Sequence, residues 1–211
     1  MTMRLYSILA LAFALAASPA LAQEPVDRPG KGDWCYNPVR SPSRADRIAF
    51  IKDISPGAIR AERRWGVPAP IIAAMGIVES GFGTTRIAIK SNNIFAYKWP
   101  GATIAAGLQR FVLWCQPDWD KGNVYPAFKT RADAVEFVGS RLRKSKYYSR
   151  ATKSYMSDIV DGKDRKNAAL SWLATIAPTY NHNGKEYFKV VAAFADNPVG
   201  DYSMSLWDLK P

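Results

Sequence analysis

Glu79 is the residue whose surroundings most favour chemistry. It follows Ile72 by seven residues and Met75 by four, so on a helix its carboxyl group lies along the apolar stripe instead of the solvated side. Desolvation disfavours the charged carboxylate and raises its pKa. A carboxylic acid that keeps its proton near neutral pH can protonate a leaving oxygen, as the general acid of a glycoside hydrolase does. Glu79 is therefore a candidate proton donor.

The sequence around Glu79 also allows a purely structural role. Gly81 and Gly83 follow at once, so the helix ends beside the carboxyl group and the backbone leaves room for a ligand. In the alternative interpretation, Glu79 is a glutamate near a helix C-terminus that pairs with a basic neighbour such as Arg86. Spacing alone leaves both interpretations open.

Glycoside hydrolysis usually needs a second carboxylate, and the sequence offers two candidates. Inverting enzymes place a base about 6.5–9.5 Å from the acid, and retaining enzymes place a nucleophile about 5–5.5 Å away. Asp118 and Asp120 are the acidic residues between Glu79 and Asp133. They are candidates by position, although an aspartate in such a turn is commonly just solvated. If a group of the substrate itself acts as internal nucleophile, no second carboxylate is required.

The elements that must position these residues belong to one globular core. The chain has 211 residues, of which 48% are hydrophobic and 22% charged. This composition excludes disorder across the whole chain and fits a single domain. The formal net charge of +11 predicts attraction to a polyanion, either nucleic acid, an anionic membrane surface or an acidic polymer. Basic runs such as residues 141–146 are interpreted as a solvated face, and no motif that reads a nucleic-acid groove is recognised.

The first 22 residues predict export. Arg4, the apolar stretch Ile8–Ala17 and the sequence Ala20-Leu21-Ala22 have the three-part layout of a secretory signal peptide. The apolar stretch is shorter than the ~20 residues of a membrane-spanning helix, so no stable span is expected after signal removal. The protein is therefore predicted to be periplasmic or secreted, and export excludes most nucleic acids as partners.

An oxidising compartment also suits the two cysteines. A bridge between Cys35 and Cys115 would close a long loop worth about 4 kcal/mol in the chain-entropy model, and two unpaired thiols are the alternative. His182, the single histidine, lies in a polar Asn-His-Asn-Gly turn without metal-ligand spacing. We therefore expect no metal site and no cofactor, and interpret His182 as an exposed turn residue.

Helical patterns dominate the folded part, with one interruption. The predicted divisions are a signal peptide at 1–22, a Pro/Gly-rich linker or surface-hugging arm at 23–42, a catalytic domain at 43–197 and a C-terminal tail at 198–211. Helices are expected over 44–54, 55–66, 71–80, 132–142, 152–161, 164–176 and 185–195. A run rich in β-branched and aromatic residues at 109–115, flanked by Gly and Pro, predicts a small β-hairpin or irregular lobe beside the active-site cleft. The expected fold class is mainly α.

Two blocks of sequence resemble the bacterial glucosaminidase-domain family of peptidoglycan hydrolases. Residues 79–84, Glu-Ser-Gly-Phe-Gly-Thr, are similar to the family's E-S-G-W-G-x-S, and residues 91–98 are similar to its N-N-L-F-G-I-K. The resemblance continues through the aromatic segment 125–128 to Tyr180 and Tyr187, and covers roughly residues 46–195. It implies a lysozyme-like α+β fold, glycan strands of peptidoglycan as the partner and Glu79 as the general acid.

The same resemblance carries an active-site tyrosine onto Tyr180. Its implied role is to orient the acetamido group or the attacking water, and a core aromatic with a bonded hydroxyl is the alternative. The spacing from Tyr180 to Tyr187 follows the Y-x-x-x-G-x-x-Y branch rather than Y-A-T-D-x-x-Y. Phe82 replaces the family's tryptophan and Ala96-Tyr97 replaces Gly-Ile, so we expect altered sugar contacts with the chemistry retained.

Further residues are candidates for substrate binding. Asn92 and Asn93 either bond the substrate through their amides or cap the turn before Ile94. Flat aromatic rings suit the apolar faces of sugars, although many aromatics build core. The aromatic candidates for the cleft are Phe95, Tyr97, Trp99, Trp114, Trp119 and Tyr187.

Three functional readings follow. The first is an exported monomeric glycosidase that cleaves the β-1,4 bond after N-acetylglucosamine in peptidoglycan. The second is a muramidase or lytic transglycosylase, which also places a glutamate in an E-S motif at a helix end. The sequence lacks the Gly-Leu-Met-Gln block common in those enzymes. The third is a catalytically inactive wall-binding scaffold, against which the intact Glu79 argues.

Overall fold

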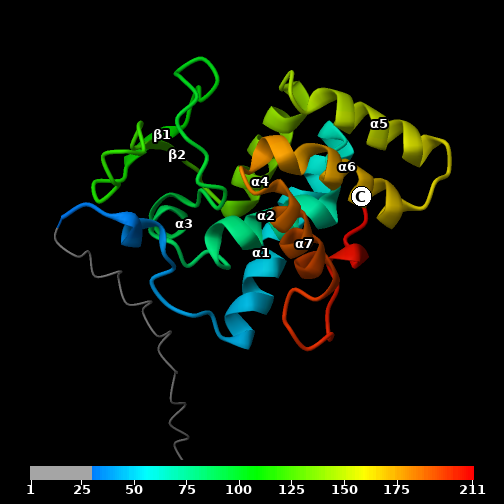
Figure 1. Ribbon diagram of the computed structural model, residues 1–211, viewed down its shortest axis with the longest axis horizontal. Helices are drawn as coiled ribbons and strands as arrows, with labels where there is room; N and C mark the ends of the chain where they lie inside the picture. Colours follow the sequence, from blue (N-terminus) through cyan, green and yellow to red (C-terminus); the bar gives the residue numbers. More distant parts are fainter. Residues whose placement is uncertain (1–29) are drawn as a thin grey trace, which may run out of the picture.

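The computed structural model describes residues 30–211, so the predicted signal peptide at 1–22 lies outside the described residues. Two regions are distinguished in Figure 1: a body of helices and, beside it, a hairpin with long loops. The elements in chain order are η1 (Asp33–Tyr36), α1 (Arg44–Trp65), α2 (Ala69–Ser80), α3 (Arg86–Ser91), β1 (Gln109–Val112), β2 (Val124–Ala127), α4 (Arg131–Lys144), α5 (Ser149–Val160), α6 (Arg165–Tyr180), α7 (Gly184–Asp196) and η2 (Leu206–Asp208). The expected mainly α fold is confirmed.

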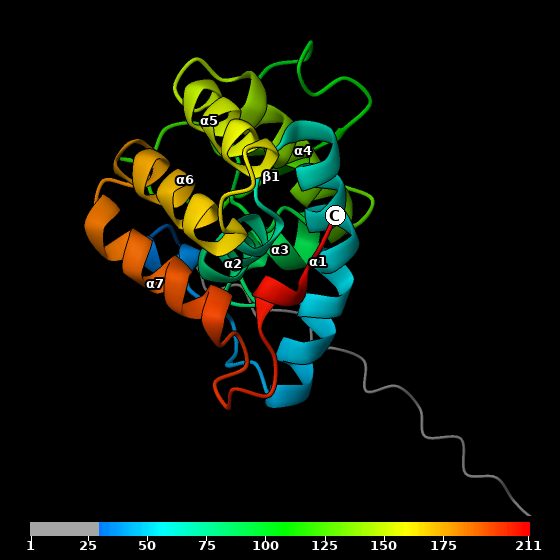
Figure 2. The same ribbon diagram turned by 90° about the vertical axis from the view of Figure 1, so that its right-hand side faces the viewer.

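The body is built around α2, whose residues from Ala69 to Ile77 are all buried. Helices α1, α4, α6 and α7 surround it, and Figure 2 shows α6 and α7 running side by side. Two glycines let α1 and α4 approach closely. A Cβ atom on Gly57 would lie 2.2 Å from the carbonyl oxygen of Ala132, and one on Gly139 would lie 2.8 Å from the Cβ of Ala61. The close packing of α1 on α4 also fixes the position of α2, which both helices contact.

The predicted break within the first helix is wrong, because α1 runs unbroken from Arg44 to Trp65. Ser55 was expected to cap a second helix, but its hydroxyl donates to the carbonyl of Ile51 in the preceding turn (2.6 Å). Pro56 lacks an N–H and so removes one backbone hydrogen bond from the helix. Packing of the whole helix against α4 outweighs that loss. The helix ends at Gly66 in the left-handed conformation, as expected.

The second region, which we call the lobe, comprises residues 97–127 and contains the hairpin. Strands β1 and β2 pair antiparallel, with Gln109 opposite Ala127 and Val112 opposite Val124. The observed strand ends at Val112, three residues before the predicted run does. The lobe packs on a small hydrophobic core made of Cys35, Ile87, Leu113 and Tyr125, which is separate from the core of the body.

The segment before α1 follows the surface as an arm over residues 30–42. A disulfide joins Cys35 in the arm to Cys115 in the lobe, with 5.6 Å between the Cα atoms. The N–H of Gly32 donates to the carbonyl of Cys115, and the N–H of Val39 donates to the carbonyl of Thr84. Of the two interpretations of this segment, the structure therefore favours the surface-hugging arm.

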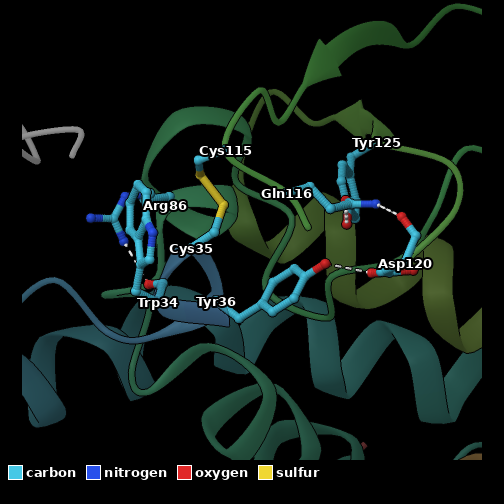
Figure 3. Close-up of a disulfide and its surroundings, with 8 residues drawn as sticks. All are labelled: Trp34, Cys35, Tyr36, Arg86, Cys115, Gln116, Asp120 and Tyr125. Atoms are coloured by element: carbon cyan, nitrogen blue, oxygen red, sulfur yellow. Dashed lines mark hydrogen bonds between the residues drawn. A yellow bond between two sulfur atoms is a disulfide. The ribbon is translucent and has the colours of Figure 1, made fainter. Parts of the chain in front are cut away.

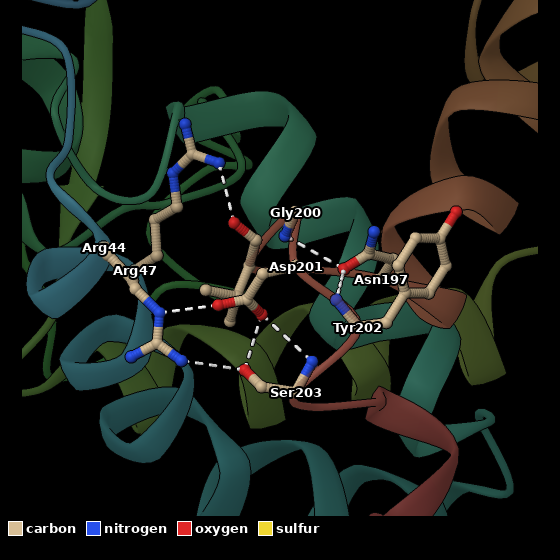
Figure 4. Close-up of polar contacts among 8 residues, drawn as sticks. Arg44, Arg47, Asn197, Gly200, Asp201, Tyr202 and Ser203 are labelled. Atoms are coloured by element: carbon tan, nitrogen blue, oxygen red, sulfur yellow. Dashed lines mark hydrogen bonds and ion pairs between the residues drawn. The ribbon is translucent and has the colours of Figure 1, made fainter.

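The C-terminal segment returns to the body. Leu206 in η2 is fully buried, and the loop before it is tied to the start of α1. Arg44 donates to Asp201 (2.6 Å) and Ser203 (2.9 Å), while Arg47 donates to the carbonyl of Val199 (Figure 4). Among the described helices, none is long and apolar enough to cross a membrane.

Candidate active site

Glu79 lies in the last turn of α2, immediately before a tight turn. Gly81, Phe82 and Gly83 all have positive φ, of 55°, 61° and 76°. Ser80 closes this turn, because its hydroxyl donates to the carbonyl of Gly76 and accepts the N–H of Gly83. The helix therefore stops directly after the carboxyl-bearing residue, and local hydrogen bonds hold it there.

Phe82 has no place in the site, which corrects the expectation that this position alters sugar contacts. Its ring is 7% exposed and packs edge-on against Phe50 and Phe194 in the core of the body. A non-glycine residue with positive φ is strained. Burial of the ring offsets that strain, so Phe82 is a packing residue that stabilises the turn.

Two hollows meet at Glu79. The first, which we call the body hollow, has a volume of about 440 Å³ and is lined by Glu79, Phe95, Ala96, Tyr97, Val138, Arg141, Leu142, Ser145, Tyr148, Tyr180 and Asn181. The second, the lobe hollow, has a volume of about 470 Å³ and is lined by Cys35, Tyr36, Glu79, Thr85, Ile87, Ala96, Lys98, Asp120, Tyr125 and His182. Glu79 and Ala96 line both. A ligand bound in either hollow would therefore lie beside Glu79.

The surroundings of Glu79 favour the protonated form of its carboxyl group. The side chain is largely buried, and this burial raises the pKa of the carboxyl group. Interaction with the hydroxyl of Tyr187 lowers the pKa in part, without reversing the shift. Arg86, the alternative partner, places its guanidinium over the indole ring of Trp34 at 4.7 Å and donates to the Trp34 carbonyl. The electrostatics therefore favour a protonated acid over a paired carboxylate.

Tyr180 lines the body hollow and Tyr187 lies behind it. The two rings are 5.4 Å apart, and Tyr180 also lies 6.2 Å from the ring of Tyr148. Burial and the charge of Glu79 raise the pKa of the Tyr180 hydroxyl well above its usual value, so it stays a neutral donor. Tyr187 is 6% exposed, and its hydroxyl makes no hydrogen bond of standard geometry within the described residues. The expectation that Tyr187 binds substrate is corrected, because it contacts the acid instead.

The two asparagines are occupied by the backbone. Asn92 caps α3 in the left-handed conformation, and its amide donates to the carbonyls of Phe128 and Lys129. Asn93 is 1% exposed, and its side chain donates to Tyr97 O and accepts Tyr97 N–H. These partners correct the expectation of direct substrate bonds and favour the capping alternative. Asn93 nonetheless matters to the site, since it fixes the loop that carries Tyr97.

The two aromatic candidates in this loop do reach the site. Phe95 and Tyr97 line the body hollow, where Tyr97 packs edge-on against Phe137. The three tryptophans of the lobe line neither hollow; two of them, Trp114 and Trp119, are strongly exposed.

Asp118 and Asp120, the two candidates for the second carboxylate, lie in different surroundings. Asp118 is exposed and pairs with Lys31 on the surface of the lobe, so the structure places it outside both hollows. Asp120 lines the lobe hollow together with Glu79. Its carboxylate accepts the hydroxyl of Tyr36 (2.6 Å) and the ammonium of Lys98 (2.8 Å), as Figure 3 shows for Tyr36. Burial alone would raise the pKa of Asp120, but these hydrogen bonds outweigh it and hold the pKa below its usual value.

Three residues that line the lobe hollow were not predicted as site residues from the sequence. Tyr36 and Lys98 hold Asp120, and His182, which is an exposed turn residue as expected, also lines the hollow. Tyr36 could have been predicted from its neighbour Cys35, because the bridge from Cys35 to Cys115 brings Tyr36 to the lobe (Figure 3). His182 could have been placed by its distance of two residues from Tyr180.

Comparison with known proteins now assigns the family. A family model described as mannosyl-glycoprotein endo-β-N-acetylglucosaminidase matches residues 55–191. The catalytic domain of the autolysin Auto from Listeria monocytogenes has a similar fold, with a TM-score of 0.50 and 18% identity over 78% of this chain and 91% of that one. Among curated proteins no match is found. Because the family model covers more than half of the chain and agrees with the residue blocks around Glu79, the protein belongs to the glucosaminidase family and is a glycoside hydrolase.

Proposed function

We propose that this protein is an exported peptidoglycan hydrolase that cleaves the β-1,4 bond after N-acetylglucosamine, with Glu79 as general acid. The observation that carries the proposal is the position of a carboxyl group with raised pKa where the two hollows meet. A sugar on each side would place the scissile oxygen beside that acid. Export is supported by the pattern of residues 1–22, and the formal charge of +11 favours retention on an acidic wall.

Asp120 is the second carboxylate of this proposal. It lines the same hollow as Glu79, and its pKa is shifted in the opposite direction. Carboxyl groups whose environments push their pKa values apart commonly divide the roles of acid and base. Asp120 is therefore suited to activate water or to stabilise positive charge on the sugar ring. In the alternative, the 2-acetamido oxygen is the nucleophile and Asp120 supports it electrostatically.

Tyr180 is the proposed positioning donor. Tyr180 lines the body hollow, and its neutral phenol can bond an acetamido oxygen or a water. Tyr180 does not exchange a proton at neutral pH, so the proposal assigns proton donation to Glu79.

The products of sacculus digestion test the function. Purified sacculi are incubated with the chain lacking residues 1–22, and the fragments are identified by mass spectrometry. Reducing-end N-acetylglucosamine is the expected product. Reducing-end muramic acid would show a muramidase, anhydro-muramyl ends a lytic transglycosylase, and binding without fragments a scaffold; each of these three outcomes contradicts the proposal.

Glu79→Gln tests the mechanism. The amide keeps the shape but carries no acidic proton, so we expect kcat to fall by about 10²–10⁴-fold. Glu186→Gln is the matched control, because Glu186 is exposed on α7 and, among residues 30–211, pairs only with Lys189. If Glu79→Gln digests sacculi as fast as this control, Glu79 is not the acid.

A further inference from the structure

Arg141 is a charged residue of the cleft that the reaction described above does not use. It lies in the last turn of α4 and lines the body hollow. Glu79 and Arg141 are the two charged residues of that lining, and the rest of the lining is apolar, aromatic or neutral polar. Arg141 is half-buried there, and a cation that has lost part of its water is stabilised when something compensates its charge.

The protein supplies no such compensation within residues 30–211. The side chain of Arg141 makes no hydrogen bond or ion pair there, and its Nε–H is buried without a partner. Arg131 Nε and Arg143 Nη1 on the same helix are also buried without a partner, but neither residue lines the body hollow. Arg60 and Arg64 both bond Glu136, and Arg131 pairs with Asp53. Arg141 thus stands out as a guanidinium held at the cleft with its hydrogen-bonding capacity unused.

The raised pKa of Glu79 agrees with a separate task for Arg141. Burial accounts for that shift and Tyr187 opposes it in part, so the guanidinium does not serve to hold Glu79 ionised. Its natural partner is an anion that arrives with the ligand. The planar fork of arginine matches a carboxylate in a bidentate geometry, better than a lysine does.

We propose that Arg141 binds a carboxylate of the glycan substrate and so selects acidic strands over neutral ones. This inference rests on the proposed function. Peptidoglycan carries carboxylates from two sources, the stem peptides and, where peptides have been removed, the free lactyl groups of muramic acid. Both present the same chemistry to a guanidinium. A neutral polymer of N-acetylglucosamine presents neither.

The test compares Arg141→Gln with wild type on three forms of the same sacculi. These are native sacculi, sacculi stripped of stem peptides by an amidase, and sacculi whose carboxylates have been converted to amides. We expect kcat/KM to fall about tenfold or more on carboxylate-bearing material, mainly through KM, and to change little on the amidated form. A fall on native sacculi alone identifies the stem peptide as the ligand, and a fall on stripped sacculi identifies the lactyl group.

Two variants make the outcome specific. Arg150→Gln removes the same charge from the exposed start of α5, outside both hollows, and controls for long-range attraction to the wall. Arg141→Lys keeps the charge without the fork and should recover part of the loss, and thermal unfolding checks that each variant folds. Equal losses on native and amidated sacculi, or no loss at all, would overturn the inference. Failure of wild type to cut any sacculi would instead overturn the proposed function.

Discussion

The two hollows beside Glu79 are built in different ways. The body hollow is formed by helices that belong to one large apolar core, and close packing of α1 on α4 sets their positions. The lobe hollow is formed by loops around a much smaller core, held by one disulfide and by polar bonds such as Tyr36 to Asp120. The body thus fixes the acid by packing, whereas the lobe fixes its partner by a few discrete bonds.

This difference indicates which region of the site tolerates the loss of a single contact and which does not. Packing energy is spread over many contacts, so a single loss in the body is partly absorbed by the rest. A region held by a few bonds loses its geometry when one of them breaks. We therefore expect changes in the lobe to affect activity more than stability, and changes in the body to do the reverse.

Loss of the disulfide gives the largest expected effect. Replacing Cys35 and Cys115 with serine opens a loop of 80 residues and should lower the free energy of unfolding by up to about 4 kcal/mol. Activity on sacculi should fall further than the loss of folded protein explains, because Tyr36 no longer holds Asp120. Urea unfolding and activity per folded molecule measure the two effects.

Reduced wild type is the matched control for the serine variant. The chain has two cysteines, so a reductant acts at this one bridge and should reproduce the variant. Hydrogen exchange should then rise in residues 97–127 and stay low in α2. Equal exchange in both regions would contradict the independence of lobe and body.

Asp120→Asn should lower kcat by on the order of 10²-fold while leaving the body intact. The pH dependence of kcat shows on which side of the profile Asp120 acts. The proposed mechanism requires Asp120 ionised and Glu79 protonated, so wild type should be active between the lowered pKa of Asp120 and the raised pKa of Glu79. The variant should lose the acid limb of this profile and keep the alkaline one. An unchanged acid limb would assign it to another group.

Gly57→Ala tests the body. The added methyl group would lie 2.2 Å from the backbone carbonyl oxygen of Ala132, so α1 and α4 must separate, at a cost of about 2 kcal/mol. Gly139→Ala is the graded companion, since its added methyl group would lie 2.8 Å from the Cβ of Ala61, a less severe approach that should cost less. Activity per folded molecule should change little in both. A neutral result for Gly57→Ala would show that the packing is looser than described.

The sequence predicts the body better than the lobe, for the same physical reason. The apolar stripe of α2 and the Thr130–Asp133 capping box of α4 are local signals, and both elements form as expected. The break at Pro56 was wrong because tertiary packing overrides a local helix breaker. Helix α3 (Arg86–Ser91) escaped prediction because six residues are too few to show a period.

In the site, the sequence identified residue types and could not give their directions. Asn92 and Asn93 have the amides that a sugar site needs, yet both point to backbone carbonyls. Tyr36 and Arg141 reach the cleft through contacts distant in sequence, which no local pattern reports. Glu79 could be recognised because its unusual feature, a carboxyl group on an apolar stripe, is itself local.

Ala96→Gly gives the smallest expected effect, at the point where the two regions meet. Ala96 lines both hollows and has a φ of 47°, a conformation that costs an alanine about 1 kcal/mol or more relative to glycine. The glucosaminidase block that residues 91–98 resemble has glycine at this position. The variant should therefore raise the free energy of unfolding by about 1 kcal/mol and the melting temperature by a few degrees.

Gly122→Ala is the control of opposite sign. Its φ is 78° and open space surrounds the position of a Cβ atom, so strain is its sole cost, and stability should fall by about 1 kcal/mol. Phe82 shows why Ala96 differs from other strained residues. The ring of Phe82 is buried between two others and offsets its strain, whereas Ala96 is partly buried and has a single methyl group to pack against the core of the lobe. If Ala96→Gly lowers stability, the methyl group contributes packing between body and lobe, and the two regions are less separate than their bonds indicate.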